Sequence, residues 1–387
     1  CEGNVPSEGN VPCEGNVPCE AFSVTVVSVD IPSGISADTG ERFGVAVCAD
    51  YTFTMGLPKR GLFLREGLQC RGAWDIIDIG FPEELLDQAE INVHLVGPAD
   101  IKQLGWFSPR SLGAHKGTFG HLLIIAGSLG MKGSAIMASL SALRAGCGLV
   151  TVAWPESIDS IAGTVMEAMT LPLSETKEGT LSLASEKTIF NAMKGKAAVA
   201  IGPGLSQNPE TVQLILNLIG QTQLPMVIDA DGINALASDL SVLKRPNRGK
   251  IILTPHPGEM GRLLGVTAET VQKDRMGTAS HFAQKWGVIV VLKGAHTLVA
   301  APDGSVAISN TGNPGMATAG AGDVLTGIIG GLLAGGMAPQ SAAINGVVLH
   351  GLAGDIACNE TGEIGLIASD IINKIPHAIQ KIKQGAS

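Results

Sequence analysis

The chain has 387 residues, of which 45% are hydrophobic and 16% are charged, and its formal net charge is −9. This length allows one large domain or two ordinary ones with a sizeable core. The acidic balance argues against nucleic acid and anionic membranes as partners, because both attract basic patches. The longest apolar run, Val324 to Ala338, falls short of the ~20 residues that a membrane span needs. We therefore expect no nucleic acid and no membrane among the partners.

The N-terminal end is a hexamer, CEGNVP, repeated in tandem with one variant copy through residue 20. Its Gly-Asn and Val-Pro steps break regular structure, so we interpret residues 1–22 as a disordered tail or an artefact of the sequence. The seven cysteines form no CxxC pair and no metal-ligand spacing with histidine, which favours reduced thiols. Without a signal-peptide pattern, we expect a cytoplasmic protein.

Strand patterns begin at residue 23. SVTVVSVD predicts a buried strand and is followed by the loop IPSGISADTGE, and YTFTM and WDIIDIG are two more candidate strands. We assign residues 23–86 to a first small domain. Residues 87–115 lack clean periodicity and contain a Ser-Pro turn, so we predict a linker there.

Strands and helices alternate regularly over residues 116–387. The predicted strands are HLLIIAG, LVTVAWP, AAVAIGPGL, PMVIDAD, GKIILTP and VIVVLKG. Helical patterns separate most of them, which predicts an α/β fold with a mainly parallel sheet and helices on both faces. LVAAPDGSVAIS predicts a hairpin at the edge of this sheet, and two helices close the chain. Ligands are expected at the carboxyl ends of the parallel strands.

One glycine-rich stretch, NTGNPGMATAGAGDVLTGIIGGLLAGG, runs from Asn310 to Gly336. A glycine inside a helix costs about 1 kcal/mol relative to alanine, so we expect these glycines to serve something other than packing. In TAGAGDVLTG the backbone amides and the start of a helix near Asp323 predict a phosphate site. Asp323 itself is either a base that takes a proton from a hydroxyl beside the transferred phosphoryl group, or a helix N-cap.

Residues Thr311 to Gly327 resemble the signature of the ribokinase-like superfamily, and VLKGAHTLVA resembles its nucleotide-contacting strand and turn. KGTFGHLLIIAGS, AIGPGL, VIDADGINAL and TPHPGE precede the glycine-rich loop in that order. The ordered set resembles the ADP- or ATP-dependent NAD(P)H-hydrate dehydratase family, with Gly232 where alanine is frequent. The resemblance implies a ribokinase-like fold and repair of the (S)-hydrate of NADH or NADPH: a nucleotide phosphorylates the ring hydroxyl, and phosphate is then eliminated.

The same resemblance assigns individual residues. It implies hydrate contacts at Ala135, Gly204, His256 and Asp323, with Asp323 as catalytic base. It implies nucleotide contacts at Lys293, Gly294, Ala295, His296, Thr297 and Gly322, an anion hole at Ala319, Gly320, Ala321 and Gly322, ADP or ATP as co-substrate, Mg²⁺ bridging the phosphates, and a homo-oligomer, a tetramer by resemblance. Without it, Ala135 would be a packing residue, Gly204 a turn residue and Lys293 a solvated lysine. In TPHPGEMGRLLG the prolines fix a turn that should hold the imidazole of His256 outward.

SVDIPSGISADTG resembles the later part of the NAD(P)H-hydrate epimerase domain that many bacterial repair enzymes carry ahead of the dehydratase. The resemblance implies a hydrate contact at Asp30 and a potassium ion held with the help of Ser33. The hexamer repeat stands where the earlier part of such a domain would be. We therefore expect residues 23–86 to be an incomplete, Rossmann-like α/β fragment without epimerase activity and with an exposed sheet edge and apolar face.

Two other functions fit part of the pattern. A ribokinase-like small-molecule kinase, such as a hydroxyethylthiazole kinase, would share the glycine-rich loop and Asp323, but KGTFGHLLIIAGS and TPHPGE are not expected in it. A non-catalytic nucleotide-binding protein is the second alternative. Retention of Asp323 and of every surrounding glycine argues against it.

Overall fold

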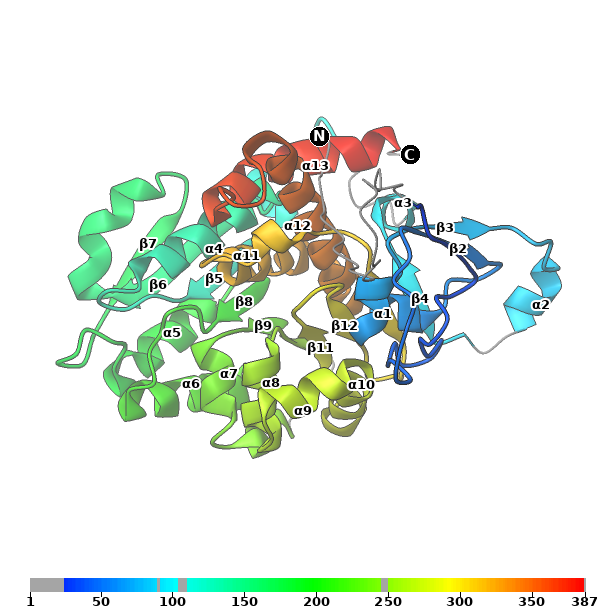
Figure 1. The fold of residues 1–387 in the computed structure, drawn as a ribbon. Helices are drawn as coiled ribbons and strands as arrows, with labels where there is room; N and C mark the ends of the chain where they lie inside the picture. The colour runs from blue at the N-terminus through cyan, green and yellow to red at the C-terminus, as the bar shows by residue number, and fades with distance from the viewer. Residues whose placement is uncertain (1–23, 89–90, 104–109, 245–249, 386–387) are drawn as a thin grey trace, which may run out of the picture.

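The computed structural model of the chain describes residues 24–88, 91–103, 110–244 and 250–385. These residues form two separate sheets (Figure 1). The smaller sheet is parallel, has the strand order β1-β2-β3, and consists of β1 (Val27–Val29), β2 (Tyr51–Met55) and β3 (Ala73–Ile77).

The larger sheet has ten strands, and only β12 runs antiparallel to its neighbours. From one edge to the other the strands are β4 (Val93–Val96), β13 (Val306–Ser309), β12 (Leu298–Ala300), β11 (Ile289–Leu292), β10 (Ile251–Leu253), β9 (Met226–Ile228), β8 (Ala198–Ile201), β5 (His121–Ile125), β6 (Leu149–Pro155) and β7 (Met169–Leu173). The predicted α/β class with a mainly parallel sheet is confirmed.

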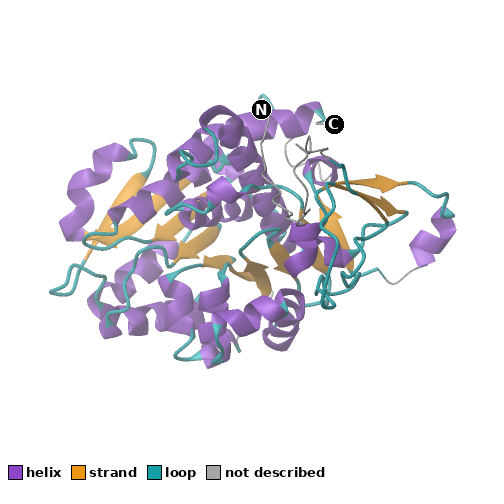
Figure 2. Ribbon diagram, in the orientation of Figure 1, coloured by secondary structure: helices purple, strands orange, loops and turns teal. Residues whose placement is uncertain are grey.

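Helices cover both faces of the larger sheet (Figure 2). One face carries α4 (Lys132–Arg144), α11 (Ala321–Ala334), α12 (Pro339–Thr361) and α13 (Ala368–Gln384). The other carries α5 (Glu186–Met193), α6 (Pro209–Gln221), α7 (Asp231–Leu236), α8 (Pro257–Leu264), α9 (Ala268–Lys273) and α10 (Arg275–Trp286). The remaining helices are α1 (Arg65–Cys70), α2 (Glu83–Gln88) and α3 (Pro98–Gln103).

Each face of the sheet has its own hydrophobic core. In β5, Leu122 and Ile124 point into the core beneath α4 and α11, whereas Leu123 and Ile125 point into the core on the opposite face. This alternation follows from the two-residue period of a strand. It also explains why the parallel strands read as continuous apolar runs, since both sides of each strand are buried.

Two expectations about the sheet edges need correction. Residues 87–115 do not form only a linker, because β4 and α3 lie within them and β4 pairs in parallel with β13. The predicted hairpin of β12 and β13 is present, but β4 covers it, so it lies one strand in from the edge. The other edge strand, β7, was also missed. The strand pattern in the sequence is weak at both edges, because each edge strand contains a residue that interrupts it. These residues are the exposed His94 in β4 and Pro172 in β7.

The small N-terminal sheet has an unusual burial pattern. The polar side chains of Ser28, Thr52 and Thr54 are buried, whereas alternate apolar side chains of β1 and β2 are exposed, among them Val29 and Phe53. Parallel strands are ordinarily covered on both faces, so an apolar face of this sheet stands open.

The expected disorder of residues 1–22 falls outside the described residues. Within the described part of the chain Cys48, Cys70, Cys147 and Cys358 are free thiols. One helix of that part, α12, is apolar and long enough to cross a membrane by length and composition, and 67% of its apolar window is buried inside the protein. A buried core helix has the same composition.

Candidate active site

The candidate site lies where the parallel strands of the large sheet end. Gly204 follows β8, Asp229 follows β9, His256 follows β10 and Lys293 follows β11. The first turn of α11 meets this edge, because a β-carbon built on Gly322 would lie 3.3 Å from Lys293 Nζ. Ligands of open α/β sheets bind outside the carboxyl ends of the strands, so the topology places these residues at the expected edge.

The start of α11 is open to an anion. Gly320 is the N-cap residue with a left-handed φ of +87°, and no side chain caps the first turn of this helix. The first amides of a helix lack intrahelical acceptors and lie at the positive end of its dipole. The residues predicted as an anion hole, Ala319 to Gly322, therefore form this loop and helix start.

Two residues of α12, Asp355 and His350, form hydrogen bonds to the glycine-rich loop. Asp355 accepts hydrogen bonds from the Gly312 amide at 2.9 Å and from Asn313 Nδ2 at 2.9 Å. Burial lowers the pKa of His350 to about 4, against the effect of its hydrogen bond to the Ala321 backbone. The loop is thus tied to a long helix by hydrogen bonds.

Asp323 is the third residue of α11, not its N-cap, which removes the capping alternative. Burial and the nearby carboxylate of Asp229 raise the pKa of Asp323 to about 6, while Ser134 donates a hydrogen bond and, with Lys293, opposes the rise. A general base works best when its pKa lies near the working pH. The position and the pKa of Asp323 both suit that task.

Lys293 is paired with carboxylates, so the alternative of a solvated lysine is wrong. Its Nζ lies 2.7 Å from Asp229 Oδ1 and 3.7 Å from Glu259 Oε2, and its side chain is 20% exposed. Thr326 donates a 2.6 Å hydrogen bond to the other oxygen of Asp229. Burial alone would lower the pKa of Lys293, but the two carboxylates raise it above its ordinary value. A charged ammonium therefore lies beside the anion hole.

His256 caps α8. Its Nδ1 accepts hydrogen bonds from the amides of Gly258 at 3.0 Å and Glu259 at 3.4 Å, so a neutral ring carries its proton on Nε2. The Glu259 carboxylate in turn accepts from the His256 amide at 2.8 Å, which completes a capping box. The side chain is 49% exposed, as the Pro-His-Pro turn predicts, so the ring edge is accessible to a ligand.

The two small residues predicted to contact the hydrate are both buried. Gly204 adopts a left-handed φ of +63°, and a β-carbon there would lie 2.9 Å from the Met131 carbonyl oxygen. Only glycine fits this close approach to the start of α4. Ala135 has no exposed surface, and its predicted contact with the hydrate stays a prediction. Ser134, one residue earlier, donates a hydrogen bond to Asp323.

The predicted nucleotide loop, Lys293 to Thr297, follows β11. Gly294 and Ala295 are exposed, and Thr297 Oγ1 donates to the Gly294 carbonyl at 3.1 Å. His296 differs from its neighbours because its ring packs edge-on against Phe63 of the N-terminal segment, 5.4 Å between centroids. The sequence gives no hint of that contact.

The epimerase-like residues lie in the other sheet. Asp30 ends β1 with a φ of +69°, pairs with Lys59 and accepts a 3.0 Å hydrogen bond from the Met55 amide. Burial opposes ionisation of Asp30, but these contacts hold its pKa below the ordinary value. Ser33 is exposed, and its carbonyl accepts from the Val47 amide at 2.9 Å. Neither residue belongs to the site around Asp323.

Four contributors to the site were not predicted from the sequence. They are Ser134, Asp229, Glu259 and Thr326. Asp229 directly follows a strand in VIDAD, a signal that could have drawn attention to it. Thr326 lies inside a helix, and its partner is 97 residues away, so no local pattern reveals it.

Among the described residues no group of three or more His, Cys, Asp or Glu side chains could hold a metal ion. Lys293 already engages the carboxylates of Asp229 and Glu259. The residues present therefore do not form a protein cage for Mg²⁺. This ion is commonly held by substrate phosphates and water with few protein ligands.

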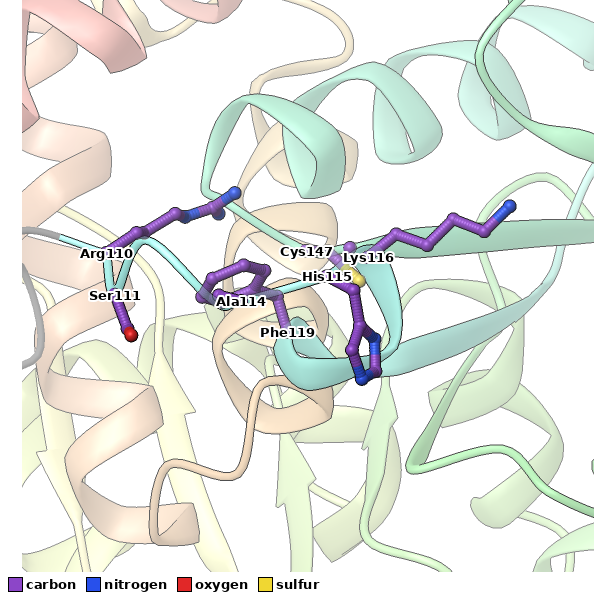
Figure 3. A pocket seen from close by; sticks show the side chains of 8 residues that line it. Arg110, Ser111, Ala114, His115, Lys116, Phe119 and Cys147 are labelled. Atoms are coloured by element: carbon purple, nitrogen blue, oxygen red, sulfur yellow. The ribbon is translucent and has the colours of Figure 1, made fainter.

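A cavity of about 360 Å³ lies away from this site (Figure 3). Its lining includes His115, Lys116 and Phe119, just before β5, and Cys147, just before β6, so it lies at the amino ends of these strands. Within it, the Arg110 guanidinium stacks on the Phe119 ring at 3.7 Å. It is therefore separate from the edge that carries Asp323.

A mainly parallel sheet with helices on both faces, together with an open glycine-rich helix start that carries the carboxyl of Asp323, is typical of the ribokinase-like class of proteins. The sequence profile of the family described as NAD(P)H-hydrate dehydratase matches residues 122–377, and that of the YjeF-related protein N-terminus matches residues 16–61. The chain belongs to the NAD(P)H-hydrate dehydratase family.

Curated relatives extend over both parts of the chain. The bifunctional NAD(P)H-hydrate repair enzyme of Moorella thermoacetica is 43% identical over 359 residues, which are 92% of this chain and 67% of the relative. The enzyme of the same name from Escherichia coli is 36% identical over 354 residues, 92% of this chain and 65% of the relative.

Solved structures agree with the assignment. The ADP/ATP-dependent NAD(P)H-hydrate dehydratase of Bacillus subtilis, co-crystallised with ATP and Mg²⁺, is 31% identical with a TM-score of 0.63, covering 76% of this chain and 99% of that one. A ribokinase-like protein of Enterococcus faecalis, at 24% identity and a TM-score of 0.65, covers 76% and 98% and shows the same fold. The family assignment does not favour the small-molecule kinase.

Proposed function

We propose that this chain dehydrates the (S)-hydrate of NADH or NADPH and restores the reduced nicotinamide, with ADP or ATP as phosphoryl donor. The observation that carries the proposal is Asp323, a half-buried carboxyl with a pKa of about 6 at the open start of α11. Membership of the dehydratase family supports the substrate and the reaction.

The first step is phosphoryl transfer. Asp323 accepts the proton of the ring hydroxyl, whose oxygen attacks the terminal phosphorus of the nucleotide. The bond between that phosphorus and the bridging oxygen breaks, so ATP leaves as ADP, or ADP leaves as AMP. The amides of the Ala319 to Gly322 loop and the ammonium of Lys293 stabilise the negative charge on the transferred group.

The second step is elimination. Hydroxide is a poor leaving group from a saturated carbon, whereas phosphate leaves readily. The lone pair of the ring nitrogen expels phosphate as the carbon–oxygen bond breaks. Loss of a proton from the neighbouring ring carbon then forms the double bond of NAD(P)H. The sum is hydrate plus ATP to NAD(P)H, ADP and inorganic phosphate, or hydrate plus ADP to NAD(P)H, AMP and inorganic phosphate.

Other residues bind rather than react. We assign the exposed ring of His256 and the backbone at Gly204 to the hydrate, and the Lys293 to Thr297 loop with Gly322 to the nucleotide. Mg²⁺ would neutralise the nucleotide phosphates and arrive bound to them.

Three further assignments remain proposals. We propose a cytoplasmic location, a homo-oligomer, and an N-terminal segment of residues 23–86 without epimerase activity, in which the carboxylate of Asp30 is already paired with Lys59. A potassium ion near Ser33 is supported only by resemblance to the epimerase. Interconversion of the hydrate epimers by the purified chain would contradict the lost activity.

The test of the main proposal is the absorbance of reduced nicotinamide. Purified chain is mixed with Mg²⁺ and NADH hydrate, with ADP and ATP in separate cuvettes, and a nucleotide-dependent rise is expected. Asp323→Asn keeps the shape of the site but removes the base, so turnover should fall by ~10²-fold or more while nucleotide binding persists.

Either of two results would contradict the proposal. Unchanged turnover in Asp323→Asn would remove this carboxylate from the mechanism. No rise in absorbance with either nucleotide, together with phosphorylation of a thiazole alcohol, would restore the small-molecule kinase.

A further inference from the structure

The N-terminal segment meets the nucleotide loop at one histidine. His296 has a φ of +50°, a left-handed conformation that residues other than glycine rarely adopt. Such a conformation persists where surrounding contacts hold it, and it is often found at functional sites. Contacts around His296 must therefore hold this backbone conformation.

Both ring nitrogens of His296 are engaged. Nδ1 lies 2.7 Å from the Ser309 carbonyl oxygen, which only accepts, so Nδ1 carries the proton. Nε2 lies 2.9 Å from Nη2 of Arg71, which only donates, so Nε2 accepts. The two contacts select one neutral tautomer. Burial lowers the pKa of the ring, and the charges of Arg71 and Arg275 lower it further, which keeps it neutral.

Arg71 reaches this position from the residue after α1, in the N-terminal segment. Its residue surface is only 8% exposed, and no carboxylate pairs with it among the described residues. Its guanidinium lies over the rings of Phe63 at 4.6 Å and Trp74 at 5.4 Å. Nη1 is buried without a hydrogen-bond partner in the described part of the chain. Burying a guanidinium this way is costly, so packing alone does not explain an arginine here.

A second arginine holds the same loop from the other side. Arg275, the first residue of α10, donates to the carbonyl oxygens of Ala295 at 2.7 Å and Leu292 at 3.2 Å. These contacts fix the backbone on either side of Lys293. The Lys293 to Thr297 loop is thus held directly by Arg275 and, through His296, by Arg71 of the N-terminal segment.

We propose that Arg71 is a positioning residue of the dehydratase: its hydrogen bond to His296 fixes the Lys293 to Thr297 loop and thereby sets the affinity for the nucleotide. This inference rests on the proposed nucleotide role of the loop. It gives the N-terminal segment a function in the dehydratase that is independent of epimerase chemistry.

The test compares Arg71→Met with the unchanged chain. Methionine keeps apolar contact with Phe63 and Trp74 but donates no hydrogen bond. Nucleotide binding is measured directly by calorimetry with Mg²⁺ and ATP, and KM and kcat are measured for the nucleotide and for the hydrate. We expect affinity for the nucleotide to fall about tenfold, the loss expected for one hydrogen bond from a charged donor, with kcat at saturation and the hydrate KM nearly unchanged.

Three controls separate positioning from general damage. Arg60→Met removes an exposed arginine of the same segment, which pairs with Asp38, and should change nothing. Arg71→Lys, which still donates, should restore part of the affinity. In a His296→Asn background, where asparagine tolerates the left-handed backbone, Arg71→Met should have no further effect.

Several outcomes would overturn the inference. They are unchanged nucleotide affinity in Arg71→Met, an equal loss for nucleotide and hydrate, or additive effects of the two substitutions. If Arg71→Met does not fold, His296→Asn with Arg71 intact must show the same selective loss. If the unchanged chain binds nucleotide but turns over no hydrate, the proposed dehydration fails while the binding comparison still decides the role of Arg71. Absence of nucleotide binding by the unchanged chain would overturn both.

Discussion

Two opposing influences act on the carboxyl of Asp323. It lies in the first turn of a helix, where the dipole favours negative charge, yet burial and Asp229 raise its pKa to about 6. The positive charge of Lys293, which lies beside the helix start, opposes this rise in the pKa of Asp323. The same ammonium pairs with Asp229. The carboxyl of Asp323 is therefore ionised at neutral pH, with a pKa close enough to that pH for it to take up a proton.

A pH profile tests this property of Asp323. The base must be deprotonated to act, so kcat/KM should fall on the acid side through the pKa of about 6, towards tenfold per pH unit well below it. Activity should level off above that value until other groups titrate. The measurement is the initial rate of dehydration at low hydrate concentration, from about pH 4.5 to about pH 8. An acid limb near the ordinary aspartate pKa would contradict the burial argument.

At the scale of elements, the glycines of α11 serve two purposes, and our expectation that packing plays no part was wrong. Gly320, the N-cap residue of α11, and Gly322, in its first turn, lie where we propose the anion hole. Farther along, β-carbons built on Gly327 and Gly331 would lie 2.1 Å and 2.9 Å from the carbonyl oxygens of Ala138 and Ala142 in α4. Glycines four residues apart lie on one face of a helix, so they let the two helices approach closely.

Gly327→Ala tests the close approach of α11 to α4. A methyl group there would overlap Ala138 and Ser141, so the free energy of unfolding should fall by about 1–3 kcal/mol, the usual cost of overpacking. Gly220→Ala is a matched control in α6, since its nearest neighbour is a side-chain atom of Val242 at 3.8 Å. The control should be neutral or slightly stabilising in urea unfolding. Equal stability of both variants would mean that the helices are farther apart than described.

At the scale of the whole molecule, the two sheets differ in how they are covered. Helices enclose the large sheet on both faces (Figures 1 and 2). The small sheet, in contrast, exposes apolar side chains at alternate positions, namely Val27, Val29, Tyr51, Phe53 and Met55. The segment between β2 and β3 contacts His296 of the larger part of the chain through Phe63 and Arg71. The open face of the small sheet affects the solubility of the chain, whereas the buried contact of Phe63 and Arg71 affects the loop that contains His296.

The exposed face of the small sheet should promote self-association of the purified chain. Val29→Lys, at a position 62% exposed, should lower light scattering at high protein concentration and leave the dehydration rate unchanged. Val45→Lys adds the same charge at a position 90% exposed outside the strands, and should lower scattering less. Equal effects of the two substitutions would assign the change to net charge and not to this face.

Local patterns in the sequence determined the class of fold, the strands of the sheet interior and the glycine-rich loop with Asp323. These features depend on short-range physics: the periods of strands and helices, the conformational freedom of glycine and the rigidity of proline. They also include the Pro-His-Pro turn, whose exposed imidazole follows from capping within a few residues. The edge strands β4 and β7 were missed because one-sided pairing relaxes the apolar pattern.

Only the tertiary structure decided which distant side chains meet. Lys293 pairs with Asp229 across 64 residues, Thr326 bonds Asp229 across 97, and Arg71 reaches His296 across 225. The pKa of Asp323 and the tautomer of His296 follow from these encounters, since burial and neighbouring charge act through space and not along the chain. The sequence by itself thus determined the chemistry that the loop offers, while the packing of the two sheets and their helices decided the charges and hydrogen bonds around it.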